Sequence, residues 1–138
     1  MSMGGDFYAL SDEQLTRLLD ETLDFGEFFY DEIEERPREC YSGGELVWYE
    51  LTQILTPEEG CGVEHTDVVP EMSGYSFSDD VESVAKQLAL LDDEEIKRRY
   101  SQIETSESFE RILEATQEVV AFYQRAAANK DAILFRVT

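Results

Sequence analysis

The feature that most constrains the fold is a long helical pattern followed by an almost unbroken apolar segment near the end of the chain. From about Ser106 to Ala128, apolar residues recur every three or four positions, which predicts a helix with one continuous apolar stripe. The stripe consists of Phe109, Ile112, Leu113, Thr116, Val119, Val120, Tyr123, Ala126 and Ala127. Asn129 is the expected left-handed stop of this helix. In Ala132–Val137 nearly every residue is apolar or β-branched, as in a strand that is covered on both faces.

The start of the chain predicts a partner for this last strand. Phe7–Leu10 is a short apolar run of strand length, and Ser11 with Gln14 forms a capping box for a helix that follows directly. Leu15, Leu18 and Leu19 share one face of that helix. We expect the first and last strands to pair in one sheet, with the Phe109–Ala127 helix packed across it.

Between these ends, the sequence predicts four more helices, at about residues 24–37, 42–56, 78–91 and 92–99. Ser78 is the expected cap of the helix that begins there. Residues 56–74 show no periodicity and are expected to form an irregular loop, with a short strand at Tyr75–Phe77. The predicted fold is α+β: a helix-rich single domain over residues 1–138, with a small sheet formed by the terminal strands.

Charge decides which partners are chemically reasonable. The chain has 32 acidic and 11 basic side chains and a formal net charge of −21. Residues 1–70 carry 18 acidic and 3 basic side chains, whereas residues 71–138 carry 14 and 8. Such a chain lacks the clustered Lys and Arg that direct binding to nucleic acid requires. The charge therefore indicates a basic protein partner, or serves only solubility.

Catalytic and metal-binding motifs are weak. Cys61, Glu64, His65 and Asp67 lie within seven positions of one another, but a structural zinc site needs a second close pair of ligands, and Cys40 is the one other cysteine. The single histidine and the lack of a Gly-x-Ser-x-Gly elbow argue against a nucleophilic enzyme. The prediction is therefore no catalytic residue, no metal and no cofactor. We also expect a cytoplasmic protein with reduced thiols, because no signal peptide or membrane-length apolar segment is visible.

An acidic and aromatic surface is the remaining candidate site. In the helix predicted at 24–37, Phe25, Phe28, Phe29 and Ile33 occupy the core face, which leaves the acidic side chains mostly outward. Tyr and Trp side chains anchor many protein interfaces, and acidic neighbours attract a basic partner. The sequence therefore predicts a docking surface on the acidic face of residues 24–50, which we call the predicted 24–50 surface. The predicted partner-binding residues in it are Asp24, Glu27, Tyr30, Asp31, Glu34, Glu35, Glu39, Tyr41 and Trp48. The alternative is an acidic face that is merely solvated.

Three segments carry a resemblance to a known family. They are Met3-Gly4-x-x-Phe7-Tyr8-Ala9-Leu10 before the first helix, Gly74-Tyr75-Ser76-Phe77-Ser78-Asp79-Asp80-Val81, and Phe122-Tyr123-Gln124-Arg125-Ala126-Ala127 before the last strand. In these segments the chain resembles the YfbM-like family of small bacterial proteins of unknown function. The resemblance implies an α+β fold and a bacterial cytoplasmic protein, and it supplies no catalytic residue.

Two classes of function remain open. The first is a non-enzymatic acidic binding protein: an immunity protein, that is, a toxin inhibitor that neutralises a basic toxin or enzyme by covering its active site. The second is a housekeeping protein or an enzyme of unknown chemistry whose acidity only aids solubility. A third possibility is a phosphate-mimicking protein that blocks a nucleic-acid-binding enzyme, which would need carboxylates spaced along a duplex-like track. In each case no membrane is involved.

Overall fold

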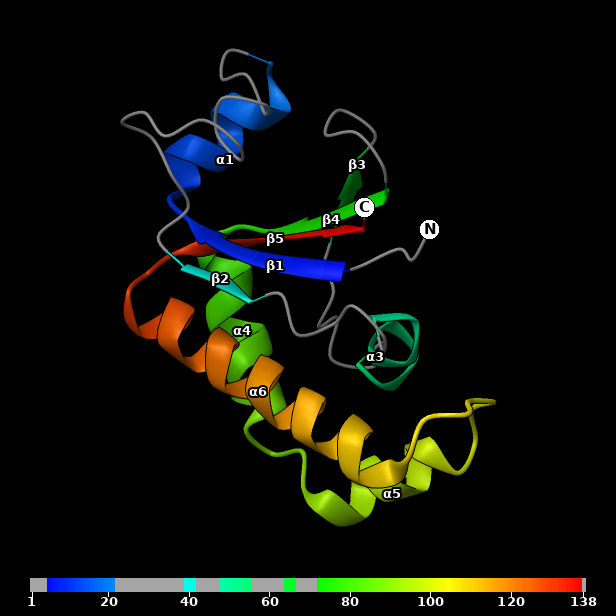
Figure 1. Cartoon of the computed structure of the whole chain (residues 1–138). Helices are drawn as coiled ribbons and strands as arrows, with labels where there is room; N and C mark the ends of the chain where they lie inside the picture. The colour runs from blue at the N-terminus through cyan, green and yellow to red at the C-terminus, as the bar shows by residue number, and fades with distance from the viewer. Residues whose placement is uncertain (1–4, 22–38, 42–47, 56–63, 67–71, 138) are drawn as a thin grey trace.

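The computed structural model describes residues 5–21, 39–41, 48–55, 64–66 and 72–137 (Figure 1). Within these ranges the elements follow in the order β1 (Gly5–Leu10), α1 (Asp12–Leu19), β2 (Glu39–Tyr41), α3 (Trp48–Ile54), β3 (Glu64–Thr66), β4 (Met72–Ser76), α4 (Ser78–Leu88), α5 (Asp93–Tyr100), α6 (Phe109–Ala128) and β5 (Ala132–Val137). The helices predicted at 24–37 and at the start of 42–56 lie outside the described residues.

The sheet places the two terminal strands side by side at its centre. Its five strands have the order β2-β1-β5-β4-β3, and every neighbouring pair is antiparallel. Phe7 pairs with Phe135 across β1 and β5, and Leu134 pairs with Tyr75 across β5 and β4. The predicted pairing of the first and last strands is therefore confirmed.

The sheet is larger than the sequence predicted. β3 and most of β4 lie within residues 56–74, which were expected to be an irregular loop, so this prediction was wrong there. β2 was not predicted either. β2 and β3 are three-residue edge strands without an apolar alternation, and they are held by backbone pairing to their neighbours. Their own sequences therefore carry little strand preference.

The main core lies between the sheet and the helices α3, α4 and α6 (Figure 1). Phe7 is at its centre: its ring centroid lies 4.6 Å from that of Phe135, 6.3 Å from that of Phe122 and 6.4 Å from that of Tyr123. Phe7, Phe122 and Tyr123 are fully buried. The prediction that the last helix packs across the paired terminal strands is confirmed.

A smaller second core lies on the opposite face of the sheet, beneath α1. It consists of Leu10, Leu15, Leu18, Ala132 and Leu134. Alternate residues of β5 therefore enter different cores, since Ile133 and Phe135 belong to the main one. This confirms that the last strand is covered on both faces. The capping box of Ser11 and Gln14 at the start of α1 is also confirmed.

The beginning of α4 differs from the prediction. Ser78 is the first helical residue rather than the cap, and Phe77 at the N-cap has no side-chain hydrogen bond to the helix. Both the backbone N–H and the Oγ–H of Ser78 donate instead to the carboxylate of Asp12, at 2.8 and 2.5 Å. Asp12 lies 66 positions earlier, in the first turn of α1. The cap of α4 is thus supplied by another helix, which sequence proximity could not reveal.

The end of α6 also differs by one residue. Asn129 has a right-handed backbone, with φ −87°, and its N–H continues the helical pattern by donating to the Arg125 carbonyl at 3.0 Å. The left-handed residue is Lys130, with φ 58°. The chain then enters β5.

None of the helices that the structure describes has the length and apolar character of a transmembrane segment.

Candidate functional site

Most of the predicted partner-binding residues fall outside the part of the chain that the structure describes. This is so for Asp24, Glu27, Tyr30, Asp31, Glu34 and Glu35. The backbone positions of the other three are described. Glu39 and Tyr41 are the ends of β2, paired with Ala9 and Phe7, and Trp48 is the first residue of α3. The structure therefore places these three on an edge strand and on a helix that packs against the main core.

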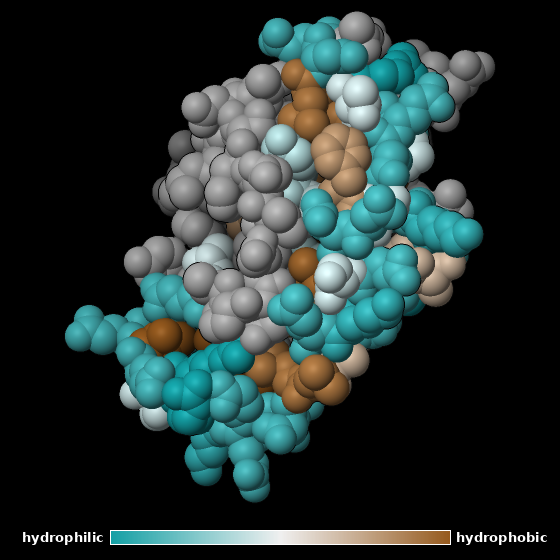
Figure 2. Space-filling model, turned by 180° about the vertical axis from the view of Figure 1, so that it is seen from behind, coloured by the Kyte–Doolittle hydropathy of each residue, from teal (hydrophilic) through white to brown (hydrophobic). Residues whose placement is uncertain are grey.

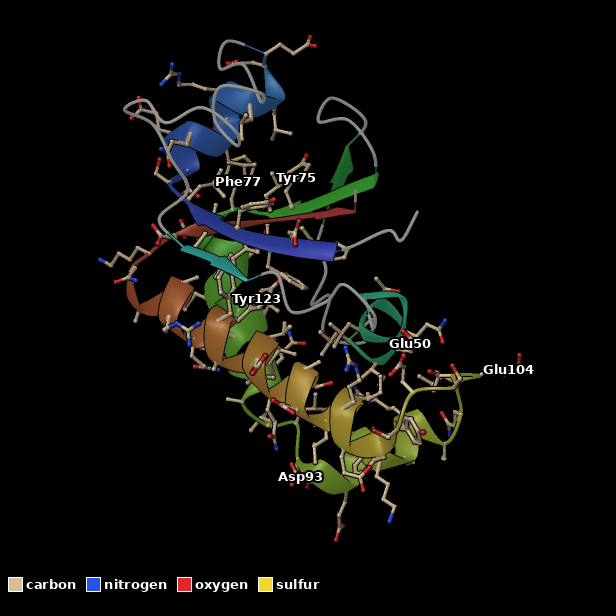
Figure 3. The ribbon with its side chains drawn as sticks, in the orientation of Figure 1. Glu50, Tyr75, Phe77, Asp93, Glu104 and Tyr123 are labelled. Atoms are coloured by element: carbon tan, nitrogen blue, oxygen red, sulfur yellow. The ribbon has the colours of Figure 1, made fainter. Side chains whose placement is uncertain are left out.

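A cluster of aromatic side chains, which we call the outer aromatic cluster, lies on the α1 side of the sheet. It consists of Tyr8, Tyr75 and Phe77, all half-buried against the second core. Tyr75 and Phe77 make an edge-to-face contact, with ring centroids 5.8 Å apart. Figure 3 shows both of them on the face of the sheet opposite to Tyr123. The Tyr8 hydroxyl donates to the carboxylate of Asp6 at 3.4 Å.

This cluster combines aromatic side chains with an acidic neighbour, as the sequence predicted for residues 24–50, but it is built from other residues. A half-buried tyrosine presents an apolar ring and a polar hydroxyl, a combination that suits a protein interface. Asp6 on β1 supplies an acidic group at its rim. Strand alternation was the available signal: Tyr8 is out of phase with the core residues Phe7 and Ala9.

Carboxylates cover the exposed faces of four helices. Exposed acidic residues on or beside α1, α4, α5 and α6 are Glu13, Asp20, Glu21, Asp79, Glu82, Asp92, Asp93, Glu94, Glu110, Glu114 and Glu118. Figure 2 shows one face of the molecule, on which hydrophilic residues border several hydrophobic patches. Ion pairs between described side chains, such as Lys86–Glu82 at 3.3 Å, join residues three or four positions apart, and Arg99 is the partner among them that is mostly buried. Such pairs do little to offset the overall negative field.

The basic end of α5 is engaged in contacts within the protein. Glu95 accepts hydrogen bonds from Arg98 and Arg99, which lower the pKa of its carboxyl from 4.5 to about 2. Arg99 also donates from Nη1 to the Ile54 carbonyl at 2.8 Å, at the end of α3. Its side chain is only 14 % exposed. Arg99 therefore contributes more to joining α5 with α3 than to the surface.

Glu50 is the acidic residue of the predicted 24–50 surface whose side chain the structure describes. Its Oε1 accepts a hydrogen bond at 2.9 Å from the hydroxyl of Thr105, which lies in the loop between α5 and α6. Thr105 Oγ1 in turn accepts from the Glu107 N–H at 3.0 Å. Figure 3 shows Glu50 on α3 facing this loop. The side chain thus helps to fix the loop.

The residues considered for metal binding and thiol chemistry are not brought together where they are described. Cys40 is on β2 and His65 is on β3, which are the opposite edges of the sheet. Cys61 and Asp67 lie outside the described residues. Within the described ranges, no group of three or more His, Cys, Asp or Glu side chains is arranged to hold a metal ion.

Taken together, the architecture is that of a small α+β protein with paired terminal strands at the centre of an antiparallel sheet, most helices on one face and α1 on the other (Figure 1). The chain belongs to the family described as Domain of unknown function (DUF1877), whose profile matches residues 1–136. The fold is similar to the crystal structure of YfbM, a protein of unknown function from Escherichia coli. The TM-score is 0.60 at 13% sequence identity, over 98% of this chain and 99% of that one. Among curated proteins, none matches this chain. The resemblance to the YfbM-like family is therefore confirmed, and it extends to the fold alone.

Proposed function

We propose that this chain is a non-enzymatic binding protein of the immunity type, which acts in the bacterial cytoplasm and neutralises a basic toxin or enzyme by covering its active site. The observation that carries the proposal is the net charge of −21, displayed as exposed carboxylates on α1, α4, α5 and α6. A field of one sign over a whole small domain raises the rate at which an oppositely charged protein arrives.

The aromatic residues supply the second half of the proposed binding mode. Charges attract a partner over a distance of about 8–10 Å at ordinary ionic strength, but they hold it weakly once it has arrived. Slow dissociation requires desolvated anchors, which are most often Tyr, Trp or Arg. Tyr8 and Tyr75 in the outer aromatic cluster, together with the predicted anchors Tyr30 and Trp48, are candidates for this role.

The direct test is capture of a partner from the source organism, followed by reconstitution with the purified partner. We expect a basic protein whose own activity is lost when the complex forms. Association should slow by at least about tenfold between 50 and 500 mM salt, while dissociation changes little. A partner that is acidic, or binding that is insensitive to salt, would contradict the proposal.

Charge reversal then locates the contact. The triple variant Asp31→Lys, Glu34→Lys and Glu35→Lys should slow association with the purified partner, because rim charges act mainly on the association rate. Truncation of Tyr30 or Trp48 to alanine should mainly speed dissociation. A thermal melt of each variant comes first, because a variant that unfolds says nothing about binding.

The matched control carries the same change of charge elsewhere on the surface. Asp79→Lys, Glu82→Lys and Glu104→Lys reverse three exposed carboxylates on α4 and on the loop before α6. If the control slows association as much as the first triple variant does, the attraction is a property of the whole chain and residues 24–50 are not its centre.

A further inference from the structure

Helix α1 lies on its own face of the sheet, opposite to α3, α4 and α6 (Figure 1). It buries two side chains, Leu15 and Leu18, whereas α6 buries seven. Among the described residues, the main core takes none of its members from α1. Most of the stability of a helix in a protein comes from the packing of its apolar face. Packing therefore stabilises α1 much less than α6.

The two ends of α1 give it the boundaries of a separate unit. A single residue, Ser11, joins it to β1, and just beyond its far end Glu21 has a left-handed backbone, with φ 64°. This conformation is unfavourable for a residue other than glycine, and unwinding of α1 would release it. α1 has eight residues, fewer than the roughly 12–15 that a helix needs to persist alone in water. Departure from the sheet and loss of helical structure are therefore one event.

One carboxylate ties α1 to the layer on the other side of the sheet. Asp12, the first residue of α1, accepts the backbone N–H of Ser78 at 2.8 Å and its hydroxyl at 2.5 Å. Ser78 begins α4, whose Val81 and Val84 belong to the main core. Both hydrogen bonds need α1 in its packed position, because Asp12 is part of that helix. Opening of α1 therefore costs these two bonds and removes the side-chain cap of α4.

We propose that α1 is a flap that opens as one unit while the rest of the described fold stays intact, and that the Asp12–Ser78 hydrogen bonds hold it closed. Opening uncovers the sheet residues of the second core, Leu10, Ala132 and Leu134, beside the outer aromatic cluster. α1 thereby controls how much of this apolar face is available to another molecule. The proposal goes beyond the binding function proposed above and does not depend on it.

Native-state hydrogen exchange of the full chain, followed by NMR at low urea concentrations, measures this opening. The probes are the helical amides of Leu15, Leu18 and Leu19 in α1, and the references are those of Val119 and Phe122 in α6. The α1 amides should share one protection factor, at least about tenfold lower than that of the references. Urea should speed their exchange less steeply than that of the references, because opening of α1 exposes less surface than global unfolding does.

Two variants test whether the Asp12–Ser78 bonds hold α1 closed. Ser78→Ala leaves the sequence of α1 intact and removes one of the bonds, so it should speed exchange of the α1 amides about tenfold. Asp12→Ala removes both bonds and should speed it about 30-fold. The matched control is Asp79→Ala, which removes an exposed carboxylate in the same turn of α4. It should leave exchange of the α1 amides unchanged, because Asp79 stabilises α4 equally whether α1 is open or closed.

Three results would overturn the proposal. If the α1 amides have the protection factor and the urea dependence of the α6 amides, α1 opens only when the whole domain unfolds. If their protection falls gradually towards the helix ends and does not respond to urea, α1 frays and does not open as a unit. If Ser78→Ala speeds exchange in α1 no more than Asp79→Ala does, the Asp12–Ser78 bonds do not hold α1 closed.

Discussion

The hydrogen bonds between Asp12 and Ser78 give the first prediction, because this one carboxylate links α1 on one face of the sheet with α4 on the other. Asp12 accepts both the backbone N–H and the hydroxyl of Ser78, and α4 has no side-chain cap of its own. Asp12→Ala should therefore remove a helix cap, worth about 1 kcal/mol, and a second charge-assisted hydrogen bond of about 1.5 kcal/mol. Because Asp12 is half-buried and water can partly replace these bonds, we expect a net loss of about 2 kcal/mol.

Urea unfolding followed by far-ultraviolet circular dichroism measures this loss. The midpoint should fall while the m-value stays unchanged, and the melting temperature should drop by roughly 6–10 °C. Asp12→Asn keeps one acceptor for the Ser78 N–H and should recover about half of the loss. The matched control is Glu13→Ala, an exposed acidic residue in the same first turn, which removes only a dipole term of about 0.3–1 kcal/mol. If Asp12→Ala and Glu13→Ala have the same melting temperature and the same urea midpoint, Asp12 does not cap α4.

Two further predictions concern α5 and α3. The Glu95 carboxyl should titrate near pH 2 by NMR, because Arg98 and Arg99 favour its charged form, and the midpoint should rise when salt is added. The stabilisation from this lowered pKa is complete above about pH 4.5 and is lost as the pH falls through about 2. Glu95→Gln should therefore unfold more easily than the wild type at pH 7, and the difference should shrink as the pH falls towards 2. Leu51→Ala should cost about 2–5 kcal/mol in urea unfolding, because Leu51 is fully buried against the main core; a loss below 1 kcal/mol would mean that α3 contributes little to the domain.

Sequence reasoning succeeded where one element carries its own pattern. The stripe on α6, the capping box of α1 and the apolar strand β5 each reflect local periodicity or local hydrogen bonding, and the structure has all three. The pairing of β1 with β5 was also accessible, since a strand that is apolar on both faces has to lie inside a sheet.

The prediction from sequence failed for features that depend on residues far away in the chain. β3 has the sequence Glu-His-Thr, which shows no strand pattern, and it is a strand because β4 pairs with it. Ser78 looked like a cap because serine often is one, whereas its partner Asp12 is distant in sequence. The outer aromatic cluster was missed for the same reason: Tyr8 and Tyr75 belong to different strands, and only the sheet brings them to one face.

The central position of β5 has a consequence for how the chain is made. β5 is the strand to which both β1 and β4 are hydrogen-bonded, and it follows every other described element in the sequence. During synthesis, β1 can pair with β2 early, but its pairing with β5 has to wait until β5 has left the ribosome. Such long-range pairing slows folding, and it leaves the apolar side of β1 exposed in the meantime. We expect the large negative charge to limit association during this interval, because like-charged nascent chains repel one another while β1 waits for β5.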